Sequence, residues 1–329
     1  MKKYNWGILG PGNISAQFTK GLKLLKNTRL YAVGSRSEER AKKFAGDFGY
    51  EKYYGSYEEL ATDPGLDIVY IASPHSHHHR HALLCLENGK HIICEKALAH
   101  NEKEVREMFG AARKGNVFMM EALWPPFQPS YIKASEILQS GIAGKILHMD
   151  CIFAFRGPFD PANRLYNPDL AGGSLLDIGI YPVMDILRYL GEPDEIKTNA
   201  IIASTGVDES ISVLFGYRSG QSASFYSSFT THGGVATKIY CEKGNIILKR
   251  RKDQSQSVKL ELSDGTEEEY IYKPEAKGYQ FEAVEVMECL DRGLTRSKVV
   301  SEEFSLSLIR TLDRIRYDAG IIYPCEKNV

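Results

Sequence analysis

Short apolar runs alternate with amphipathic stretches along the first third of the chain. Predicted strands are 4–9, 30–33, 67–72, 91–94 and 117–120, and the stretches 14–25, 37–48, 75–88 and 102–114 between them have helical spacing. Ser37, followed by two glutamates, is typical of a helix start, and Gly89 is well placed to end a helix. Strands alternating with helices predict an α/β domain with a doubly wound parallel sheet.

The pattern changes after about Leu123. Predicted strands now follow one another with tight turns between them, at 146–155, 210–217, 221–229, 236–241, 246–249 and 258–262. Helical stretches lie at 175–190, 279–292 and 305–319. We therefore expect one domain over 1–122 and a second, α+β domain over 123–329, with an open, mainly antiparallel sheet and helices on one face.

Composition and charge exclude several classes of protein. The 329 residues include 41 basic and 42 acidic ones, so there is no basic excess to hold nucleic acid. No run approaches the roughly 18 apolar residues that span a bilayer, and the N-terminal MKKYNWGILGPG fits a buried strand entering a turn better than a signal peptide. Six scattered cysteines without a CxxC pair indicate reduced thiols and a cytoplasmic protein.

A run of histidines, SPHSHHHRHA over 73–82, raises the question of a metal site. On the predicted helix His78 shares the buried face with Ala82, whereas His77 and His81 pair on another face. That pair could hold an adventitious ion, but a catalytic zinc site needs three protein ligands and no third is suitably spaced. The run therefore predicts no metal, one or two histidines with a role, and a solvated remainder.

The segment from Gly10 through Gly12, Asn13 and Ile14 to Ser15 lies between a predicted strand and a predicted helix. It matches the start of a dinucleotide fingerprint, in which glycines let the backbone approach a pyrophosphate at a helix N-terminus. Serine stands where a third glycine is usual. A purely structural turn remains the alternative.

The second strand ends in Ser35, Arg36 and Ser37, with no carboxylate before Glu38. An acidic residue at this point would bind the ribose hydroxyls of NAD, whereas a guanidinium beside hydroxyls suits the 2′-phosphate of NADP. The sequence therefore favours NADP(H) over NAD(H). The alternative is that Arg36 is a solvated turn residue.

Two further segments carry candidate chemistry. Glu95 and Lys96 end the fourth predicted strand, where ligands bind in doubly wound sheets, although an ordinary ion pair fits equally well. Asp177 and Tyr181 are four residues apart in GGSLLDIGIYP and share a face of a helix. A tyrosine hydroxyl beside a lysine ammonium can act as a general acid; the alternative is that Tyr181 packs in a core.

Together these motifs resemble the glucose–fructose oxidoreductase/inositol dehydrogenase (Gfo/Idh/MocA) family over essentially the whole chain. The resemblance is carried by GILGPGNIS (7–15), SRS (35–37), SPHSHH (73–78), GKHIICEK (89–96), EALW (121–124) and GGSLLDIGIYP (172–182). Members have an N-terminal Rossmann domain and a C-terminal domain whose open sheet often forms oligomer contacts, which implies a homodimer or homotetramer. The sequence looks most like dimeric dihydrodiol dehydrogenases and NADP-dependent sugar dehydrogenases.

The resemblance implies hydride transfer between nicotinamide and the carbinol or carbonyl carbon of a sugar, polyol or cyclic diol, without a metal. It implicates Lys96, Asp177 and Tyr181 in catalysis, with Tyr181 or Lys96 as the proton donor. Cofactor contacts are expected from Gly10, Gly12, Asn13, Ile14, Ser35, Arg36, Ser73, Pro74, His75, His78, Glu95 and Lys96. Substrate contacts are expected from Trp124, Arg156, Arg164, Asp177 and Tyr181.

One departure from the family and three rival hypotheses remain. The family's EKP has become Glu95-Lys96-Ala97, so the conformation of this loop is less constrained by the sequence. A non-catalytic NADP-binding regulator and a redox-neutral relative are the first two alternatives, although retention of Lys96 and Tyr181 argues against the regulator. A metal-dependent hydrolase centred on the histidines is the third.

Overall fold

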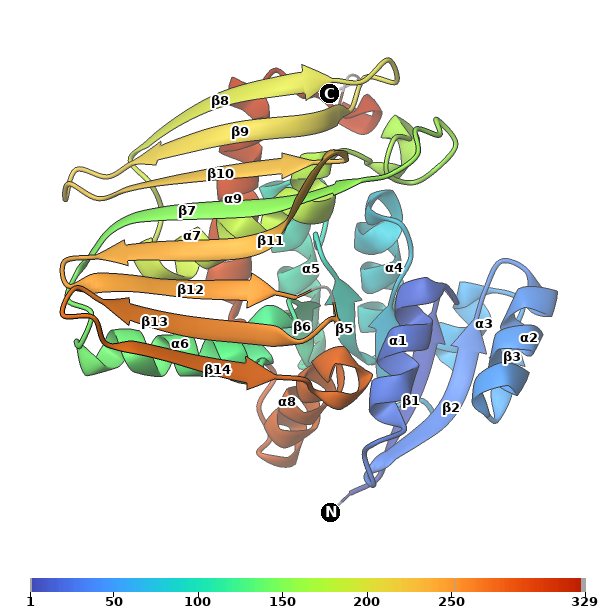
Figure 1. Cartoon of the computed structure of the whole chain (residues 1–329). Helices are drawn as coiled ribbons and strands as arrows, with labels where there is room; N and C mark the ends of the chain where they lie inside the picture. Colours follow the sequence, from blue (N-terminus) through green and yellow to red (C-terminus); the bar gives the residue numbers. More distant parts are fainter. Residues whose placement is uncertain (1, 252, 327–329) are drawn as a thin grey trace. The chain divides into compact units, whose positions relative to one another are not determined.

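The computed structural model in Figure 1 describes residues 2–251 and 253–326, and its chain forms two compact units. Of the described residues, unit 1 comprises those up to 127 and those from 275 to 306, and unit 2 comprises those from 128 to 274 and those from 307 onward. The sequence predicts a single boundary after 122. In the structure, by contrast, residues 275–306 return to the first unit. They do so because this segment packs on the first helix, where a Cβ at Gly21 would lie 2.8 Å from the Gln280 amide nitrogen.

Unit 1 is built on a six-stranded parallel sheet. Its strands are β1 Tyr4–Leu9, β2 Thr28–Gly34, β3 Lys52–Tyr54, β4 Ile68–Ile71, β5 His91–Glu95 and β6 Met119–Ala122, in the order β3-β2-β1-β4-β5-β6. All four residues of β4 are buried, as expected for a sheet covered on both faces. The chain order reverses between β1 and β4, and open α/β sheets bind ligands beyond the carboxyl ends of strands at such a point.

The helices of unit 1 follow the predicted pattern except for one short helix, at 57–62, that the sequence did not predict. They are α1 Asn13–Leu22, α2 Glu38–Phe48, α3 Tyr57–Thr62, α4 His75–Glu87, α5 Glu102–Gly115 and α8 Gln280–Asp291, with short turns η1 Pro125–Phe127 and η4 Glu275–Gly278. Ser37 caps α2 by accepting a hydrogen bond from the Arg40 amide at 3.3 Å, which confirms the predicted helix start.

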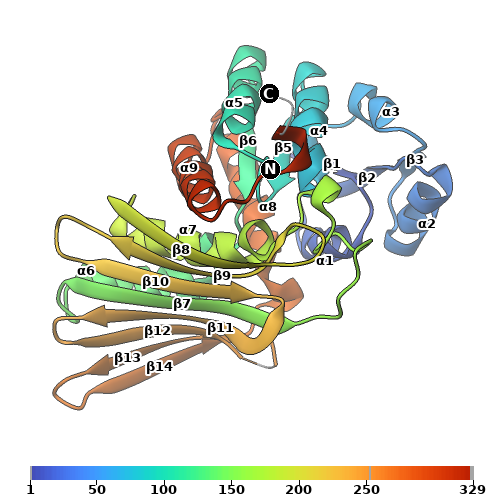
Figure 2. The same cartoon turned by 90° about the horizontal axis from the view of Figure 1, so that it is seen from above.

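Unit 2 is built on an eight-stranded sheet, seen from above in Figure 2. Its strands are β7 Ile146–Arg156, β8 Glu195–Ile202, β9 Asp208–Gly216, β10 Ser222–Ser228, β11 Thr230–Cys241, β12 Gly244–Arg250, β13 Gln256–Leu262 and β14 Glu267–Tyr272. The order is β14-β13-β12-β11-β7-β10-β9-β8, and only the β7–β10 pair is parallel among the strands described. The predicted α/β domain followed by a mainly antiparallel α+β domain is confirmed.

Helices pack against one face of this second sheet. They are α6 Pro129–Ser140, the π-helical turn η3 Leu175–Gly179, α7 Ile180–Leu190 and the part of α9 (Glu302–Asp318) that lies in unit 2, with short turns η2 Pro168–Leu170 and η5 Pro324–Glu326. Asp185 of α7 accepts hydrogen bonds from Tyr131 of α6 and Thr237 of β11, which places both helices on the same face. The stretch Pro168–Leu190 is long and apolar enough to cross a membrane, but 89% of its most apolar window is buried, as in a core helix.

Candidate active site

The glycine turn leaves space where a phosphate group would lie. Gly10 has φ +91°, and a Cβ there would lie 3.1 Å from the Ala72 carbonyl oxygen, so this position requires glycine. A Cβ at Gly12 would meet nothing within 4 Å. The turn opens directly into α1, whose first amides carry the positive end of the helix dipole, so its geometry suits a pyrophosphate.

Ser15 explains the departure from the glycine fingerprint. Its hydroxyl donates to the Gly10 carbonyl oxygen at 2.7 Å, and the side chain is fully buried. The serine therefore fixes the turn from inside the first helical turn and leaves the open space beside Gly12 unobstructed.

Arg36 lies exposed beyond the end of β2, between two ordered serines. Ser35 is buried and accepts from the Ser37 amide at 3.2 Å. Arg40, which the sequence reasoning missed, donates to the Pro11 carbonyl oxygen at 3.2 Å and so joins α2 to the glycine turn. Its spacing of four residues from Arg36, at a helix start, is the signal that could have identified it.

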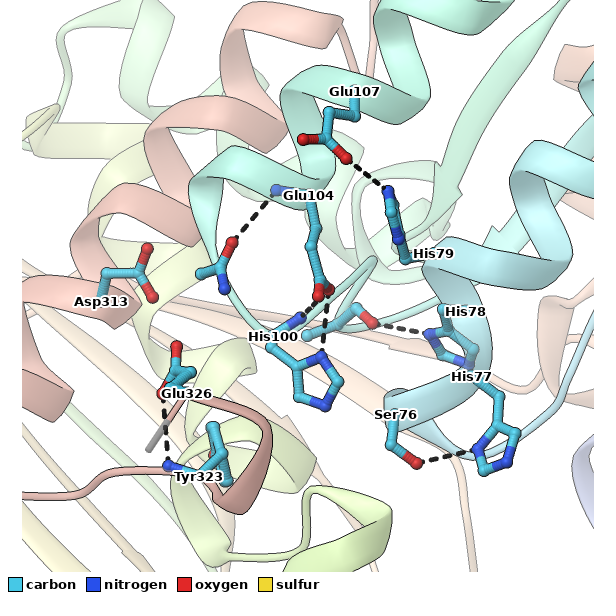
Figure 3. Close-up of polar contacts among 12 residues, drawn as sticks. Ser76, His77, His78, His79, His100, Glu104, Glu107, Asp313, Tyr323 and Glu326 are labelled. Atoms are coloured by element: carbon cyan, nitrogen blue, oxygen red, sulfur yellow. Dashed lines mark hydrogen bonds and ion pairs between the residues drawn. The ribbon is translucent and has the colours of Figure 1, made fainter. Parts of the chain in front are cut away.

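The histidine run forms the start of α4, and its side chains bind neighbouring groups in unit 1 (Figure 3). The two ring nitrogens of His78 lie 2.8 Å from the Ala97 carbonyl oxygen and 2.7 Å from that of Ser73. His75 contacts the Lys96 carbonyl oxygen at 3.1 Å, while His79 pairs with Glu107 at 2.9 Å. The run therefore ties the turn after β4 to the loop after β5.

His81 corrects part of the sequence interpretation. It is buried, and its Nδ1 lies 2.9 Å from the Ser73 hydroxyl, so it does not belong to a solvated remainder. Burial lowers the pKa of both His78 and His81 to about 4, so both rings are neutral at physiological pH. Within residues 2–251 and 253–326, no group of three His, Cys, Asp or Glu side chains could hold a metal ion.

The loop that carries Lys96 is held by two carboxyl groups, the half-buried Glu95 and the buried Glu121, as well as by histidines. Glu95 accepts from the Tyr70 hydroxyl and, at 3.3 Å, from the Lys96 amide. Glu121 accepts from the Leu98 amide at 3.3 Å, and burial raises its pKa to about 7. The Lys96–Ala97 peptide bond is cis. Alanine replaces the family's proline at position 97, and the contacts from Glu95, Glu121 and the histidines hold the backbone of this loop.

Glu282 of α8 is a buried carboxyl group that sequence reasoning missed. It is 1% exposed, and within the described part of the chain neither of its oxygens has a hydrogen-bond partner. Burial, together with the negative charge of Glu95, raises its pKa well above the usual range. The helix carries three glutamates, at 282, 285 and 288, and their spacing does not identify the one that is buried.

Unit 2 contains the aspartate and tyrosine candidates. Asp177 lies in η3, and its Oδ1 accepts from Arg164 Nη1 at 2.6 Å. Tyr181 follows in the first turn of α7, with its ring 5.5 Å from that of Phe153. The sequence predicts a regular helix here, whereas the helix begins with a π-helical turn, a feature frequent at functional sites.

The remaining predicted substrate residues have different surroundings. Trp124 lies in unit 1, is 8% exposed and has its ring 5.9 Å from that of Tyr279. Arg156 is exposed at the end of β7 and is paired in register with Thr230 of β11. Thus Lys96, Trp124 and the predicted cofactor residues belong to unit 1, whereas Arg156, Arg164, Asp177 and Tyr181 belong to unit 2.

Known proteins similar to this chain match nearly its whole length. Trans-1,2-dihydrobenzene-1,2-diol dehydrogenase from Mus musculus is 35% identical over 335 residues, covering 98% of this chain and 99% of the relative. The protein of the same name from Xenopus laevis is 34% identical over 330 residues, covering 97% and 99%.

Two solved structures share the fold. Levoglucosan dehydrogenase in complex with NADH and L-sorbose has a TM-score of 0.87 at 19% identity, covering 97% of each chain. A 3-ketoreductase from Actinomadura kijaniata, in complex with TDP-benzene and NADP, has a TM-score of 0.83 at 22% identity, covering 96% of this chain and 97% of that one.

Family profiles match both parts of the chain. The profile described as an oxidoreductase family with a NAD-binding Rossmann fold matches residues 4–122, and the GFO/IDH/MocA C-terminal domain matches residues 131–247. The chain therefore belongs to the Gfo/Idh/MocA family of nicotinamide-dependent oxidoreductases.

Proposed function

We propose that this chain is an NADP(H)-dependent dehydrogenase or reductase of cyclic diols, polyols or sugars. The observation that carries the proposal is the likeness to dihydrodiol dehydrogenases at 34–35% identity over nearly the full length. The chain also retains Lys96, Asp177 and Tyr181 within the motifs that resemble the active-site motifs of these relatives.

The preference for NADP(H) rests on the end of β2. Arg36 is exposed there beside two serines, and no carboxylate precedes Glu38. Its charge lowers the pKa of His77, after a larger effect from burial, so the guanidinium acts on the start of α4 as well. A cationic surface of this kind favours a 2′-phosphate over a pair of ribose hydroxyls.

The cofactor would supply the hydride donor or acceptor. The glycine turn would hold its pyrophosphate, through Gly10, Gly12 and the first residues of α1, Asn13 and Ile14. Ser73, Pro74, His75, His78 and Glu95 would shape the nicotinamide end, because they surround the turn and loop that end β4 and β5.

Proton transfer is assigned to Tyr181 or Lys96, and substrate orientation to Asp177. The Asp177 carboxylate accepts a hydrogen bond from the Arg164 guanidinium, and carboxylate oxygens can also accept hydrogen bonds from substrate hydroxyls. Trp124 and Arg156 are proposed to contribute to the substrate site. The proposed role of each of these residues rests on the motif match with the family.

The cellular setting and assembly are part of the same proposal. Five cysteines, at positions 85, 94, 151, 241 and 289, are free and buried, which supports a reducing, cytoplasmic compartment. Exposed Leu214, Ile201 and Ile271 on the strands of unit 2 support association through its sheet, as a homodimer or homotetramer.

The test is a substrate panel with purified protein, followed by the absorbance of the reduced nicotinamide. Trans-dihydrodiols, aldoses and polyols are offered with NADP⁺, and the corresponding carbonyl compounds with NADPH. We expect turnover in at least one class, and a higher kcat/KM with NADP(H) than with NAD(H). Failure of every substrate with both cofactors, while NADPH still binds, would favour the regulator.

A further inference from the structure

A buried carboxylate caps the helix that carries Asp177 and Tyr181. Asp208, the first residue of β9, is fully buried, and its Oδ2 accepts from the Ser174 hydroxyl and the Leu175 amide, each at 2.7 Å. Leu175 begins the helix, so its amide has no carbonyl partner one turn earlier within the helix. The cap thus comes from a residue 33 positions away and not from the preceding Ser174.

The same carboxylate and the neighbouring loop leave no room for a side chain at the two glycines before the helix. Gly173 has φ +119°, and a Cβ at this position would overlap Asp208 Oδ1. A Cβ at Gly172 would lie 2.8 Å from the carbonyl oxygen of Arg164. The Gly173 amide also donates to the Leu165 carbonyl oxygen at 2.8 Å, so this turn joins the Arg164 loop to the helix.

The choice of an aspartate here is costly for folding. Burial raises the pKa of Asp208 to about 6, although its bonds to Ser174 and Leu175 oppose this effect. An uncharged serine or asparagine could cap the helix without burying a carboxylate. A negative charge on Asp208 would interact favourably with the positive N-terminal end of the helix dipole, and a neutral cap would interact with it less strongly. What the geometry shows is that one oxygen of Asp208, Oδ2, accepts both from the Ser174 side chain before the helix and from the first amide of the helix.

We propose that Asp208 is a positioning residue for the reaction. By holding the Gly172–Ser174 turn, its carboxylate fixes the relative positions of Asp177, its partner Arg164 and Tyr181. This inference rests on the proposed function for the roles of Asp177 and Tyr181. Asp208 itself acts through the Gly172–Ser174 turn, because its carboxylate accepts from the Ser174 hydroxyl and from the Leu175 amide that follows the turn.

The experiment compares Asp208→Ala with Asp208→Asn and Ser174→Ala. Small misplacements of reacting groups lower rates strongly, so we expect Asp208→Ala to reduce kcat roughly 10- to 100-fold. The dissociation constant for NADPH should stay within about twofold, because the proposed cofactor residues belong to unit 1. Asp208→Asn keeps an acceptor oxygen and should recover most of kcat, and Ser174→Ala, which removes one bond to Asp208, should fall between them.

Ser56→Ala is the control for loss of a helix cap alone. Ser56 accepts from the Glu59 amide at 3.1 Å at the start of α3 and has no part in the proposed site. It should lower the melting temperature without changing kcat. A kcat for Asp208→Ala within twofold of the unmodified protein overturns the proposal, and so does equal loss in the alanine and asparagine variants.

Hydrogen exchange of peptides covering 163–181 separates this inference from the proposed function. Faster exchange in Asp208→Ala than in Asp208→Asn supports the positioning role even if every offered substrate fails in the unmodified protein. Unchanged exchange in both variants overturns it. If Asp208→Ala does not fold, Ser174→Ala decides: unchanged kcat and unchanged exchange overturn the proposal, and a loss of kcat with faster exchange supports it.

Discussion

Arg164 donates to the Asp177 carboxylate across 2.6 Å, from a loop that the Gly172–Gly173 turn fixes to the same helix. The Arg164 side chain is 56% exposed, whereas that of Asp177 is only 8% exposed. An exposed guanidinium that is paired with a buried carboxylate can orient the carboxylate and can still contact a ligand that arrives from solvent. The sequence places Arg164 among substrate contacts; its ion pair gives it a second proposed role, that of orienting Asp177.

Removal of this guanidinium should impair the reaction more than the stability of the fold. Because Arg164 is half exposed, its ion pair contributes at most about 1 kcal/mol to folding. We expect Arg164→Met to lower kcat/KM roughly tenfold, since a charge-assisted hydrogen bond to Asp177 is lost. Arg218→Met is the control, because it removes an exposed arginine that pairs with Asp194 at 3.4 Å. Equal kcat/KM in both variants would argue against the role of Arg164.

Two neighbouring glycines should respond oppositely to the same substitution. Gly12→Ala adds a methyl group in open space, so the protein should keep its melting temperature while its affinity for NADPH falls at least about tenfold. Gly10→Ala forces a positive φ on alanine beside the Ala72 carbonyl oxygen and should lower the melting temperature. Thermal unfolding and fluorescence titration with NADPH measure both effects. Unchanged affinity in Gly12→Ala contradicts the assignment of this turn.

The cofactor preference should depend on Arg36. Arg36→Ala should lower the ratio of kcat/KM for NADPH to that for NADH at least about tenfold, because the proposed 2′-phosphate contact disappears. Arg29→Ala is the matched control at the opposite end of β2, where the arginine pairs with Glu51. A ratio that falls equally in both variants, or in neither, would show that Arg36 does not select the cofactor.

A buried carboxyl in unit 2 should make stability depend on pH. Burial raises the pKa of Asp185 from 3.8 to about 7, so the folded protein binds this proton more tightly than the unfolded chain. The stability that this proton contributes is present below pH 3.8 and is lost as pH rises towards 7, by an amount on the order of 4 kcal/mol.

Asp185→Asn removes this titration and keeps an acceptor for Thr237 and Tyr131. Relative to the unmodified protein, the variant should therefore gain stability as pH is raised from 5 to 8 (a range of about three units around the raised pKa). Urea unfolding of both proteins across this range gives the difference directly. A difference that does not change with pH would mean that Asp185 titrates near its usual value.

Strong hydrophobic periodicity made the fold class predictable. The strands β3 and β14 were not predicted, because their sequences carry little of this periodicity. The apolar runs that became β1, β4 and β5 are bounded by turn residues, and these strands are almost wholly buried. β14 begins with three glutamates, a composition that suits an exposed edge strand but gives little strand signal. β3 has only three residues.

The candidate site was predictable where a local motif carries it. Gly10, Gly12 and Arg36 follow from strand-turn-helix spacing, and Lys96 lies at the end of a strand that the sequence identifies. Asp208 and Glu282 owe their environments to contacts with residues far away along the chain, and no spacing rule identifies such contacts. His81 was misplaced because helical spacing does not show that Ser73 and Tyr57 cover this face of α4.

The most direct measurement is turnover by Lys96→Met and Tyr181→Phe, each compared with the unmodified protein on the best substrate of the panel. Both substitutions remove a proton-donating group and leave the proposed contacts of the glycine turn and Arg36 in place. We predict that kcat falls below detection in each variant, while the dissociation constant for NADPH changes by less than about threefold. Near-normal kcat in both variants would contradict proton transfer by these residues and the catalytic site proposed around them.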